Sequence, residues 1–256
     1  MVGDVHVERI GFSALKGGRH VARPASLLAA SGPVGDRVLC LVDATRDRVL
    51  RTVENPSMVQ AVAHVEGEVL RVDLPSGTVE GVPEGTGELV TVDYWGRDAE
   101  VELLAGPWSQ AFSAHLGYDV RLAWPTRTGS VVYGGSVTLV STGSVARLGR
   151  ELGRPVLSER FRATYLVDTE DLDPHAEDRW VGREVRLGEA RVRVRGRVPR
   201  CAVVDLDPVS GARDTPVLAT LAGYRRYDGE ICFGVDAEVT VPGRVSVGDP
   251  VVLRRE

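Results

Sequence analysis

Cys201 is the residue of this sequence whose surroundings best suit chemistry. It follows the segment Arg195-Gly196-Arg197-Val198-Pro199-Arg200, so it leaves a predicted strand through a proline-containing turn among several guanidinium groups. Nearby positive charge favours the thiolate, which is the form that attacks electrophiles and ligates metals. A buried cysteine that packs as a small hydrophobic residue is the alternative. Cys40 and Cys232 lie in apolar segments and are expected in the core.

Two other segments have residues that could bind an anion. Arg160 and Arg162 flank Phe161, and in a strand both guanidinium groups would point to one face, where they could contact phosphate or carboxylate in a bidentate manner. Residues 141–144 open a predicted helix, and the free backbone N–H groups and hydroxyls of such a helix start form a natural anion site. A solvated strand face and simple helix capping are the respective alternatives.

Several common types of site are disfavoured by spacing. The three cysteines form no CxxC pair and the five histidines no HxH or HExxH motif, which argues against zinc sites, iron–sulfur clusters and a disulfide scaffold. The sequence contains no GxGxxG, Walker loop or GxSxG elbow. The carboxylates of Glu170, Asp171, Asp173, Glu177 and Asp178 lie in a turn-like stretch and are expected to be solvated.

The composition is that of an ordinary globular protein. The 256 residues are 43% hydrophobic and 26% charged, so the chain can bury a core without metal or disulfide staples and is not intrinsically disordered. A net charge of -5 argues against general nucleic-acid binding. No apolar run reaches the ~18–20 residues of a membrane span and no signal-peptide core is present. We therefore expect the protein to lie in the reducing cytoplasm, without membrane association.

Many short strands must position these residues. Glycine and proline interrupt the chain every few residues, and the intervening runs are rich in valine. Strands are predicted at residues 38–42, at 62–72 around a turn at Gly67 and at 191–195, and residues 245–253 are expected to form a turn that leads into a closing strand. In residues 191–195 the strict alternation points the valines to a core and the arginines to the other side. Residues 79–87, which are acidic and rich in glycine and proline, are expected to form a loop, and residues 124–130 a linker.

Three helices are predicted between these strands. The first opens at Pro107, has an apolar stripe at four-residue spacing and ends at Gly117. The second extends from residues 141–144 to Gly153, and the third begins at Pro216, with Asp214 or Thr215 as its cap. The sequence therefore predicts a mainly β chain with a few short helices (α+β), in two strand-dominated halves.

Taken together, these motifs resemble the MOSC family, named after the C-terminal domain of molybdenum-cofactor sulfurases. The overall plan is most similar to its branch of amidoxime- and N-hydroxylated-compound reductases. The resemblance extends from about Val5 to Arg254 and is most specific in the second half. The motifs there are Arg160-Phe161-Arg162, residues 176–182, Pro199-Arg200-Cys201, residues 207–211, Phe233-Gly234-Val235 and residues 242–249. The N-terminal half rests on Ser13-Ala14-Leu15-Lys16-Gly17, Gly35-Asp36-Arg37 and residues 51–56.

The resemblance implies a fold, a cofactor and its site. Residues 1–123 would form a MOSC N-terminal β-barrel-like domain, packed on a MOSC β-barrel domain at residues 124–256. The cofactor would be the molybdenum cofactor, Mo-molybdopterin, with Cys201 as both metal ligand and catalytic residue. The residues implied to hold the cofactor are Lys16 (the only lysine of the chain), Arg37, Arg162, Arg200, Gly134, Gly135 and Thr164.

The chain departs from the family's pattern at three places. Gly17 replaces a frequent serine, Tyr133 begins a Tyr-Gly-Gly segment where Asp-Thr-Ser or similar is common, and Ala163-Thr164 replaces Pro-Asn. Each lost hydrogen bond to a charged group costs on the order of 1.5–3 kcal/mol. Thr164 or backbone N–H groups can offset such losses.

The expected function is a molybdenum-dependent reduction of N-hydroxylated or N-oxygenated small molecules. No pyridoxal phosphate and no iron–sulfur cluster are expected in this chain. Electrons would therefore come from a separate donor protein of the ferredoxin or flavin-reductase type. Two alternatives stay open. One is a sulfurtransferase with a Cys201 persulfide, charged by a separate cysteine desulfurase. The other is a non-catalytic carrier of the molybdenum cofactor.

Overall fold

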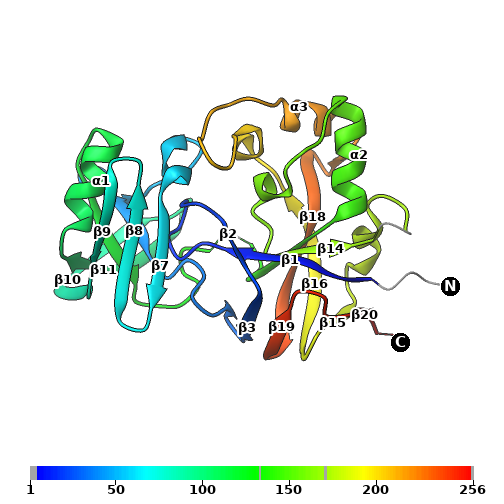
Figure 1. Cartoon of the computed structure of the whole chain (residues 1–256), viewed down its shortest axis with the longest axis horizontal. Coiled ribbons are helices and arrows are strands. Elements are labelled where there is room, and N and C mark those ends of the chain that lie inside the picture. The colour runs from blue at the N-terminus through cyan, green and yellow to red at the C-terminus, as the bar shows by residue number, and fades with distance from the viewer. Residues whose placement is uncertain (1–4, 133, 170–171, 255–256) are drawn as a thin grey trace.

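The computed structural model describes residues 5–132, 134–169 and 172–254. Figure 1 shows two β-rich regions side by side along the long axis of the molecule. One region contains β7 to β11 and α1, and the other contains β14 to β20, α2 and α3. The described part of the chain is mainly β with three α-helices, which confirms the predicted fold class.

The region at the C-terminal end of the chain is built on one large sheet. Its described strands have the order β2-β1-β14-β13-β18-β16-β15-β20, with β17 paired to β18. Strands β13 and β14 are parallel, and the other pairs are antiparallel. The strands are β1 (His6–Phe12), β2 (Val21–Arg23), β13 (Val137–Ser141), β14 (Tyr165–Asp168), β15 (Glu184–Leu187), β16 (Ala190–Pro199), β17 (Arg226–Tyr227), β18 (Glu230–Val241) and β20 (Val251–Leu253).

Alternation along β16 and β18 places one face of this sheet in the core. Val192 and Val194 of β16 are buried together with Val235 and Ala237 of β18, and Val194 lies directly opposite Ala237. Burial of each of the larger side chains contributes about 1.5–3 kcal/mol. The arginines between the valines are exposed, so the predicted orientation of residues 191–195 is confirmed.

The other region consists of a closed barrel and a separate small sheet. The barrel has the order β10-β11-β12-β5-β6, and the sheet the order β7-β8-β9. The strands are β5 (Cys40–Asp43), β6 (Arg48–Val49), β7 (Val62–Glu66), β8 (Val69–Leu74), β9 (Gly77–Gly81), β10 (Glu84–Asp93), β11 (Asp98–Ala105) and β12 (Val120–Pro125). The turn at Gly67 lies between β7 and β8 as predicted, whereas β5 begins two residues later than the predicted strand.

The expectation of a loop at residues 79–87 is wrong. Most of this segment belongs to β9 and β10. Gly85 pairs with Leu104 of β11, and a Cβ atom added at Gly85 would overlap the Glu102 carboxylate. The glycine here therefore makes room for a cross-strand side chain and does not mark a turn.

A third sheet ties the two ends of the chain together. It has the order β19-β3-β4, with β3 (Ala25–Ala29), β4 (Gly32–Pro33) and β19 (Gly243–Ser246). Strand β1 also pairs with β14, so the first strands of the chain pair with strands of the C-terminal region. The division into residues 1–123 and 124–256 stays a prediction.

The helices are those that the sequence predicts. They are α1 (Trp108–Leu116), α2 (Thr142–Leu152) and α3 (Val217–Ala222), and the 3₁₀ helices are η1 (Pro56–Gln60), η2 (Ser158–Phe161), η3 (Ala176–Trp180) and η4 (Ala202–Asp205). Gly117 and Gly153 end α1 and α2 in the left-handed conformation. The cap predicted for α3 is wrong, because Asp205 of η4 accepts the Leu218 N–H at 2.8 Å. Among the described residues, every helix is too short or too polar to span a bilayer.

Candidate functional site

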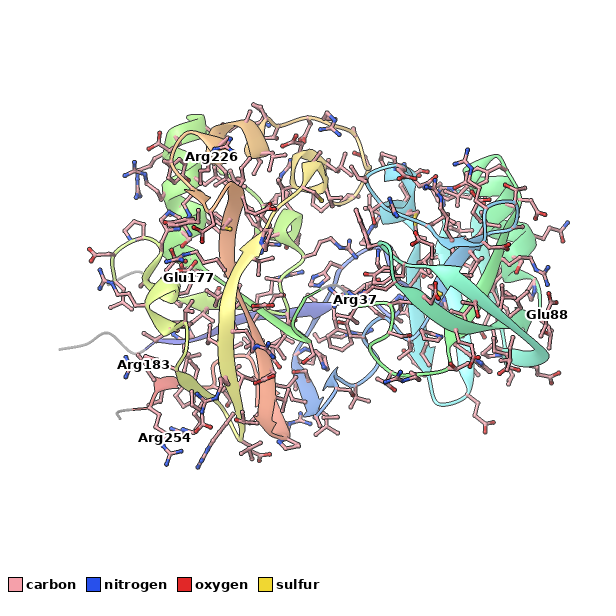
Figure 2. The ribbon with its side chains drawn as sticks, turned by 180° about the vertical axis from the view of Figure 1, so that it is seen from behind. Arg37, Glu88, Glu177, Arg183, Arg226 and Arg254 are labelled. Atoms are coloured by element: carbon pink, nitrogen blue, oxygen red, sulfur yellow. The ribbon has the colours of Figure 1, made fainter. Side chains whose placement is uncertain are left out.

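A cavity of about 330 Å³ lies where loops of the two regions meet. One wall comes from residues between 16 and 95, and the other from residues between 138 and 230. Figure 2 labels Arg37, one of the lining residues, in the centre of the molecule between the two regions. Five of the residues that the sequence assigns to the cofactor site line this cavity, namely Lys16, Arg37, Arg162, Arg200 and Cys201.

Cys201 is placed at the cavity by the end of strand β16. The strand ends at Pro199, and the N–H of Arg200 donates to the carbonyl of Ile231 in β18 at 2.7 Å. Because of this bond, the backbone remains paired with the sheet up to Arg200, the residue before Cys201. Cys201 is exposed, whereas Cys40 and Cys232 are buried as predicted. Of the three thiols, only that of Cys201 is therefore accessible to a ligand or substrate.

Arg200 has a guanidinium group with one unsatisfied donor. Its Nε donates to the carbonyl of Phe233 and its Nη1 to the carbonyl of Phe161, both at 2.8 Å. Its Nη2 is buried without a hydrogen-bond partner among the described residues. Burial lowers the pKa of Arg200 to about 10, an effect opposed by the nearby Cys201. An anion in the cavity would supply the missing acceptor.

Lys16 is held by backbone pairing with the segment just before β5, where Leu15 and Leu39 form a parallel bridge. Its N–H donates to the carbonyl of Leu39 at 2.7 Å, and its ammonium lies 5.6 Å from the centre of the Tyr94 ring. It has no ion pair with any described residue. Burial and the positive charges of Arg162 and Arg37 lower the pKa of Lys16 to about 8. The cavity thus contains the Lys16 ammonium without a carboxylate partner among the described residues.

The departure at Gly17 has a steric reason. Gly17 has a φ of +87°, and a Cβ atom there would lie 2.6 Å from Met58 Cε and 2.9 Å from Thr52 Oγ1. A serine at this position would require both the disfavoured backbone conformation and a shift of Met58. Thr52 itself lines the cavity and presents a hydroxyl within reach of the space that a serine would fill.

Arg37 and Arg162 both have left-handed backbone conformations, with φ values of 48° and 51°. Arg37 Nη1 forms an ion pair with Asp36 Oδ2 at 2.6 Å. The Arg162 guanidinium makes no hydrogen bond with any described residue. Burial, followed by the charge of Arg37, lowers the pKa of Arg162 to about 10, and Asp36 opposes this effect. Non-glycine residues in this conformation are uncommon and often mark functional sites.

Residues 160–162 do not form a strand. Arg160 and Phe161 belong to the 3₁₀ helix η2, and Arg162 caps it, so the two arginines do not project from one face of a strand. Arg160 is buried and donates from Nη2 to Asp214 at 2.8 Å, while its Nη1 is buried without a partner among the described residues. Both arginines still line the cavity.

Three residues predicted to contact the cofactor do not line this cavity. Gly135 donates its N–H to Asp236 Oδ2 at 2.8 Å, and a Cβ atom there would lie 2.8 Å from the Ala237 carbonyl oxygen, so Gly134 and Gly135 pack against β18. The Thr164 hydroxyl accepts the N–H of Thr138 at 3.2 Å. Tyr133 lies outside the described residues.

Sequence reasoning missed the aromatic wall of the cavity. Tyr94 is buried beneath Lys16, and Trp95 is 42% exposed and also lines the cavity. The Arg51 guanidinium lies 4.3 Å from the centre of the Trp95 ring, a distance at which a cation and an aromatic ring attract each other. Both aromatic residues belong to the turn between β10 and β11, far in sequence from every other site residue, so no local motif marks them.

The start of α2 is not available to an external anion. The Glu177 carboxylate is fully buried there and accepts hydrogen bonds from the hydroxyls of Ser141 at 2.7 Å and Ser144 at 2.6 Å. The expectation that Glu177 is solvated is therefore wrong, and capping is the correct interpretation of residues 141–144. Asp178 is mostly buried and pairs with Arg225. Glu170 and Asp171 lie outside the described residues.

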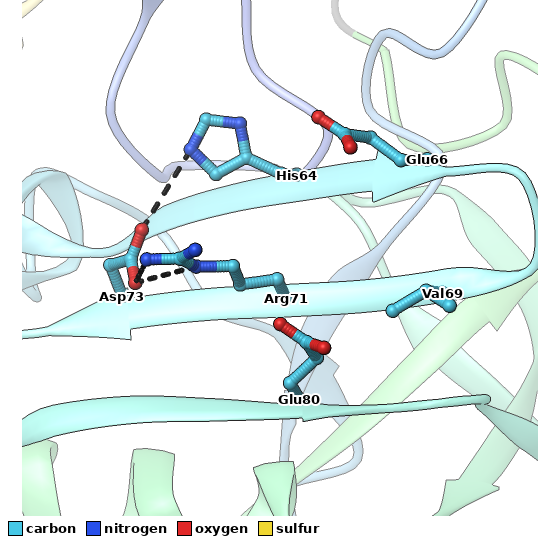
Figure 3. Close-up of a pocket in the computed structure, with 6 residues that line it drawn as sticks. All are labelled: His64, Glu66, Val69, Arg71, Asp73 and Glu80. Atoms are coloured by element: carbon cyan, nitrogen blue, oxygen red, sulfur yellow. Dashed lines mark hydrogen bonds and ion pairs between the residues drawn. The ribbon is translucent and has the colours of Figure 1, made fainter.

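A second hollow lies on the outer face of β7–β9 (Figure 3). His64 and Arg71 pair there with Asp73, at 3.9 and 3.0 Å. Glu66 and Glu80 also line it, so its carboxylates outnumber its basic groups. The cavity at Cys201 differs from this hollow in two ways that matter for chemistry, namely an accessible thiol and an excess of positive charge.

Comparison with known proteins assigns the second half of the chain to a family. The profile described as "MOSC domain" matches residues 128–252. The chain contains a MOSC domain. The matched segment includes Arg160, Arg162, Arg200 and Cys201, four of the residues that line the cavity.

Curated relatives of this MOSC protein share only part of their length with it. The "Molybdenum cofactor sulfurase" of Oryza sativa subsp. japonica is 33% identical over 112 residues, which are 40% of this chain and 13% of the rice protein. The proteins of the same name from Solanum lycopersicum and Pyricularia oryzae are 37% and 39% identical, over 30% and 24% of this chain and 9% and 7% of their own length. The MOSC protein thus spans at most 13% of the length of these three relatives.

Two solved structures are similar to this chain, one over most of its length and the other over about half of it. The "YUAD protein from Bacillus subtilis" has a TM-score of 0.48 and 15% identity, and the similarity covers 96% of this chain and 93% of that one. "YiiM from Geobacillus stearothermophilus" has a TM-score of 0.35 and 16% identity, over 47% of this chain and 55% of that one.

Proposed function

We propose that this MOSC protein binds a molybdenum cofactor in the Cys201 cavity and reduces N-hydroxylated or N-oxygenated compounds, with electrons from a separate donor protein. The observation that carries the proposal is the combination of an exposed thiol with cations that lack carboxylate partners, around one cavity. Lys16 and Arg162 make no ion pair with the described residues, and Cys201 lines the same cavity.

The cavity suits an anionic ligand of this size. Its volume of about 330 Å³ falls within the range of pockets that hold small molecules and cofactors, about 300–1,000 Å³. Nη2 of Arg200 and Nη1 of Arg160 are buried donors without partners among the described residues. Buried donors without acceptors are rare in folded proteins and cost about 1–3 kcal/mol each. A phosphate-bearing ligand would remove this cost.

The residues around the cavity would have different roles in binding the cofactor and the substrate. Lys16, Arg37 and Arg162 would neutralise the phosphate, because the three charges line the same cavity and lie close enough to act on one another. The thiolate of Cys201 would bind the metal, which would supply two-electron redox chemistry next to the substrate. Trp95, a partly exposed aromatic residue of the cavity lining, would shield one side of the bound substrate from water. Arg200, braced by two carbonyl groups, would hold its backbone and hence Cys201 in place.

Metal and pterin analysis tests this function. The protein would be produced in a host that makes molybdenum cofactor, as wild type, Cys201→Ser and the control Cys232→Ala, which removes a buried thiol outside the cavity lining. We expect near-stoichiometric molybdenum and pterin in the wild type and control, and loss of molybdenum in Cys201→Ser. Reduction of a hydroxylamine or amidoxime with dithionite as the electron source would follow the metal content. Full activity in Cys201→Ser would refute the assignment.

Sulfur transfer is the second candidate, since the curated relatives that match are named molybdenum cofactor sulfurases. In that case Cys201 would accept the terminal sulfur of a desulfurase persulfide and pass it on, and no metal would be required. Incubation with a cysteine desulfurase and cysteine would then add a mass of about 32 Da that depends on Cys201. Tight cofactor binding without turnover would instead indicate a carrier.

A further inference from the structure

The outer face of the large sheet bears a row of arginines that the cavity does not use. Arg191, Arg193 and Arg195 alternate along β16 with buried residues, and all three are exposed. Beyond them a shift of the strand register places Arg197 opposite the buried Val235, and Arg197 pairs with Asp178 of η3 at 3.1 Å. The neighbouring strands add Arg186 of β15 and Arg254 beyond β20 to the same face. Figure 2 shows Arg254 at the end of this sheet, near Arg183.

This face is basic although the chain is acidic. Five arginines share it with three carboxylates of the neighbouring strands, Glu184, Asp236 and Glu238, while the whole chain has a net charge of -5. Arg195 pairs with Glu238 at 2.7 Å, and Glu184 is shared by Arg254 and Arg191 at 3.0 and 3.8 Å.

Two arginines of this face remain without a carboxylate partner among the described residues. Arg193 donates to the carbonyl of Gly182 at 3.3 Å and Arg186 to that of Gly188 at 3.5 Å. Carbonyl groups carry no net charge, so these two guanidinium groups leave positive charge exposed on the sheet. They are the groups that a partner's carboxylates could neutralise.

The strand that bears the row ends close to Cys201. Strand β16 ends at Pro199, two residues before Cys201, which is itself exposed. At about 3.3 Å per residue in a strand, Arg195 lies at most about 20 Å from Cys201 along the chain, and Arg191 about 33 Å. A protein that covered β16 would therefore also reach the side of the cavity where the thiol lies.

We propose that the outer face of β15, β16, β18 and β20 is the docking surface for an acidic face of the electron-donor protein. The inference rests on the proposed reductase function and adds the place and charge of its partner. Complementary charge accelerates encounter and fixes orientation, and a basic face on an otherwise acidic chain concentrates this attraction at one place. A nucleic acid would extend past this face and meet the net negative remainder of the chain.

Binding to an acidic plant-type [2Fe–2S] ferredoxin tests the surface. The double variant Arg186→Glu/Arg193→Glu reverses the two arginines without breaking an ion pair, and Arg186→Gln/Arg193→Gln only neutralises them. The matched control Arg46→Glu/Arg127→Glu makes the same change of net charge at exposed positions in the loops at residues 44–47 and 126–130. We expect about tenfold weaker ferredoxin binding for the reversed variant at low ionic strength, an intermediate loss for the neutral one, and little change for the control.

The outcomes separate this inference from the function on which it rests. Molybdenum content and turnover with dithionite, measured on the same preparations, report the proposed function and should be equal in all variants. Unchanged ferredoxin binding in the reversed variant would refute the proposed docking surface. An equal loss of affinity in the control variant would also refute it, as would binding to the wild-type protein that added salt does not weaken. Tighter binding of a single-stranded oligonucleotide than of ferredoxin would also overturn it, in favour of a nucleic acid.

Discussion

Lys16 provides the sharpest test of a cationic cavity, because its pKa depends on what fills the cavity. A pKa lowered from 10.5 to about 8 means that holding the ammonium in the empty site costs about 3 kcal/mol. The unfolded chain binds the proton more tightly, so the stability of the ligand-free protein should rise as pH increases from about 8 to about 10.5. A bound anion should raise the pKa of Lys16, so anion affinity should fall as pH rises through about 8.

The assay uses the fact that Lys16 is the only lysine of the chain. Protein labelled with ¹³C-lysine gives a single side-chain Cε resonance, which reports protonation directly. We expect a midpoint near pH 8 in the free protein. Saturating sulfate, whose charge does not change in this range, should move the midpoint up by a unit or more. Cys201→Ser should lower the midpoint, because the nearby Cys201 raises the pKa of Lys16.

Lys16→Arg is the matched variant for this experiment. It should remove the resonance, which assigns the signal, and keep anion binding, whereas Lys16→Met should weaken sulfate binding by about 1.5–3 kcal/mol, the contribution of one hydrogen bond to a charged group. Calorimetry in two buffers would show proton uptake on binding at pH 8 in the wild type only. A free-protein midpoint near 10.5, or a midpoint that ignores sulfate, would refute the reasoning.

Three further results are expected. Cys201→Ser should keep the wild-type free energy of unfolding to within about 0.5 kcal/mol while it loses molybdenum, because the side chain is exposed; urea denaturation beside metal analysis checks both. Asp178→Ala should lower the free energy of unfolding by about 3–5 kcal/mol, because it leaves the buried Arg225 without its carboxylate partner. The control Asp173→Ala breaks an exposed ion pair and should lower it by less than about 1 kcal/mol. Equal losses of stability in the two variants would contradict this account. Burial lowers the pKa of His175 to about 4, so stability should fall by up to about 3 kcal/mol as pH drops from about 6.5 to about 4; His175→Phe should flatten this slope in urea titrations at several pH values.

Periodicity predicted the elements of this fold well where one face of an element is buried. Alternating valines located β16, and capping residues located the ends of α1 and α2, because both signals depend on near neighbours. The prediction failed at residues 79–87, where a glycine accommodates the Glu102 side chain of the facing strand. It also failed at the α3 cap, since Asp205 reaches that helix from η4. These contacts are set by tertiary packing, which one sequence does not display.

The site shows the same division between local and distant information. Cys201 and Arg200 were predictable from their own segment, because the thiol follows a strand and a proline turn. The family resemblance was needed for Lys16 and Arg37, which reach the cavity from the other end of the chain. Trp95 had no signal of either kind. Gly135 and Thr164 lay in recognisable motifs, yet in this chain they bond to Asp236 and Thr138.

The charge balance of the cavity bears on the choice between the two proposed functions. A persulfide carrier requires an accessible thiol, and Cys201 alone would satisfy that need. It does not require Lys16 and Arg162 to lack carboxylate partners among the described residues, nor an Arg200 Nη2 atom that is buried there without an acceptor. Each such group lowers stability, since desolvated charges and donors without acceptors are costly. An anionic ligand that remains bound during function compensates for these costs, and so the cations favour a resident phosphate-bearing cofactor over a bare thiol.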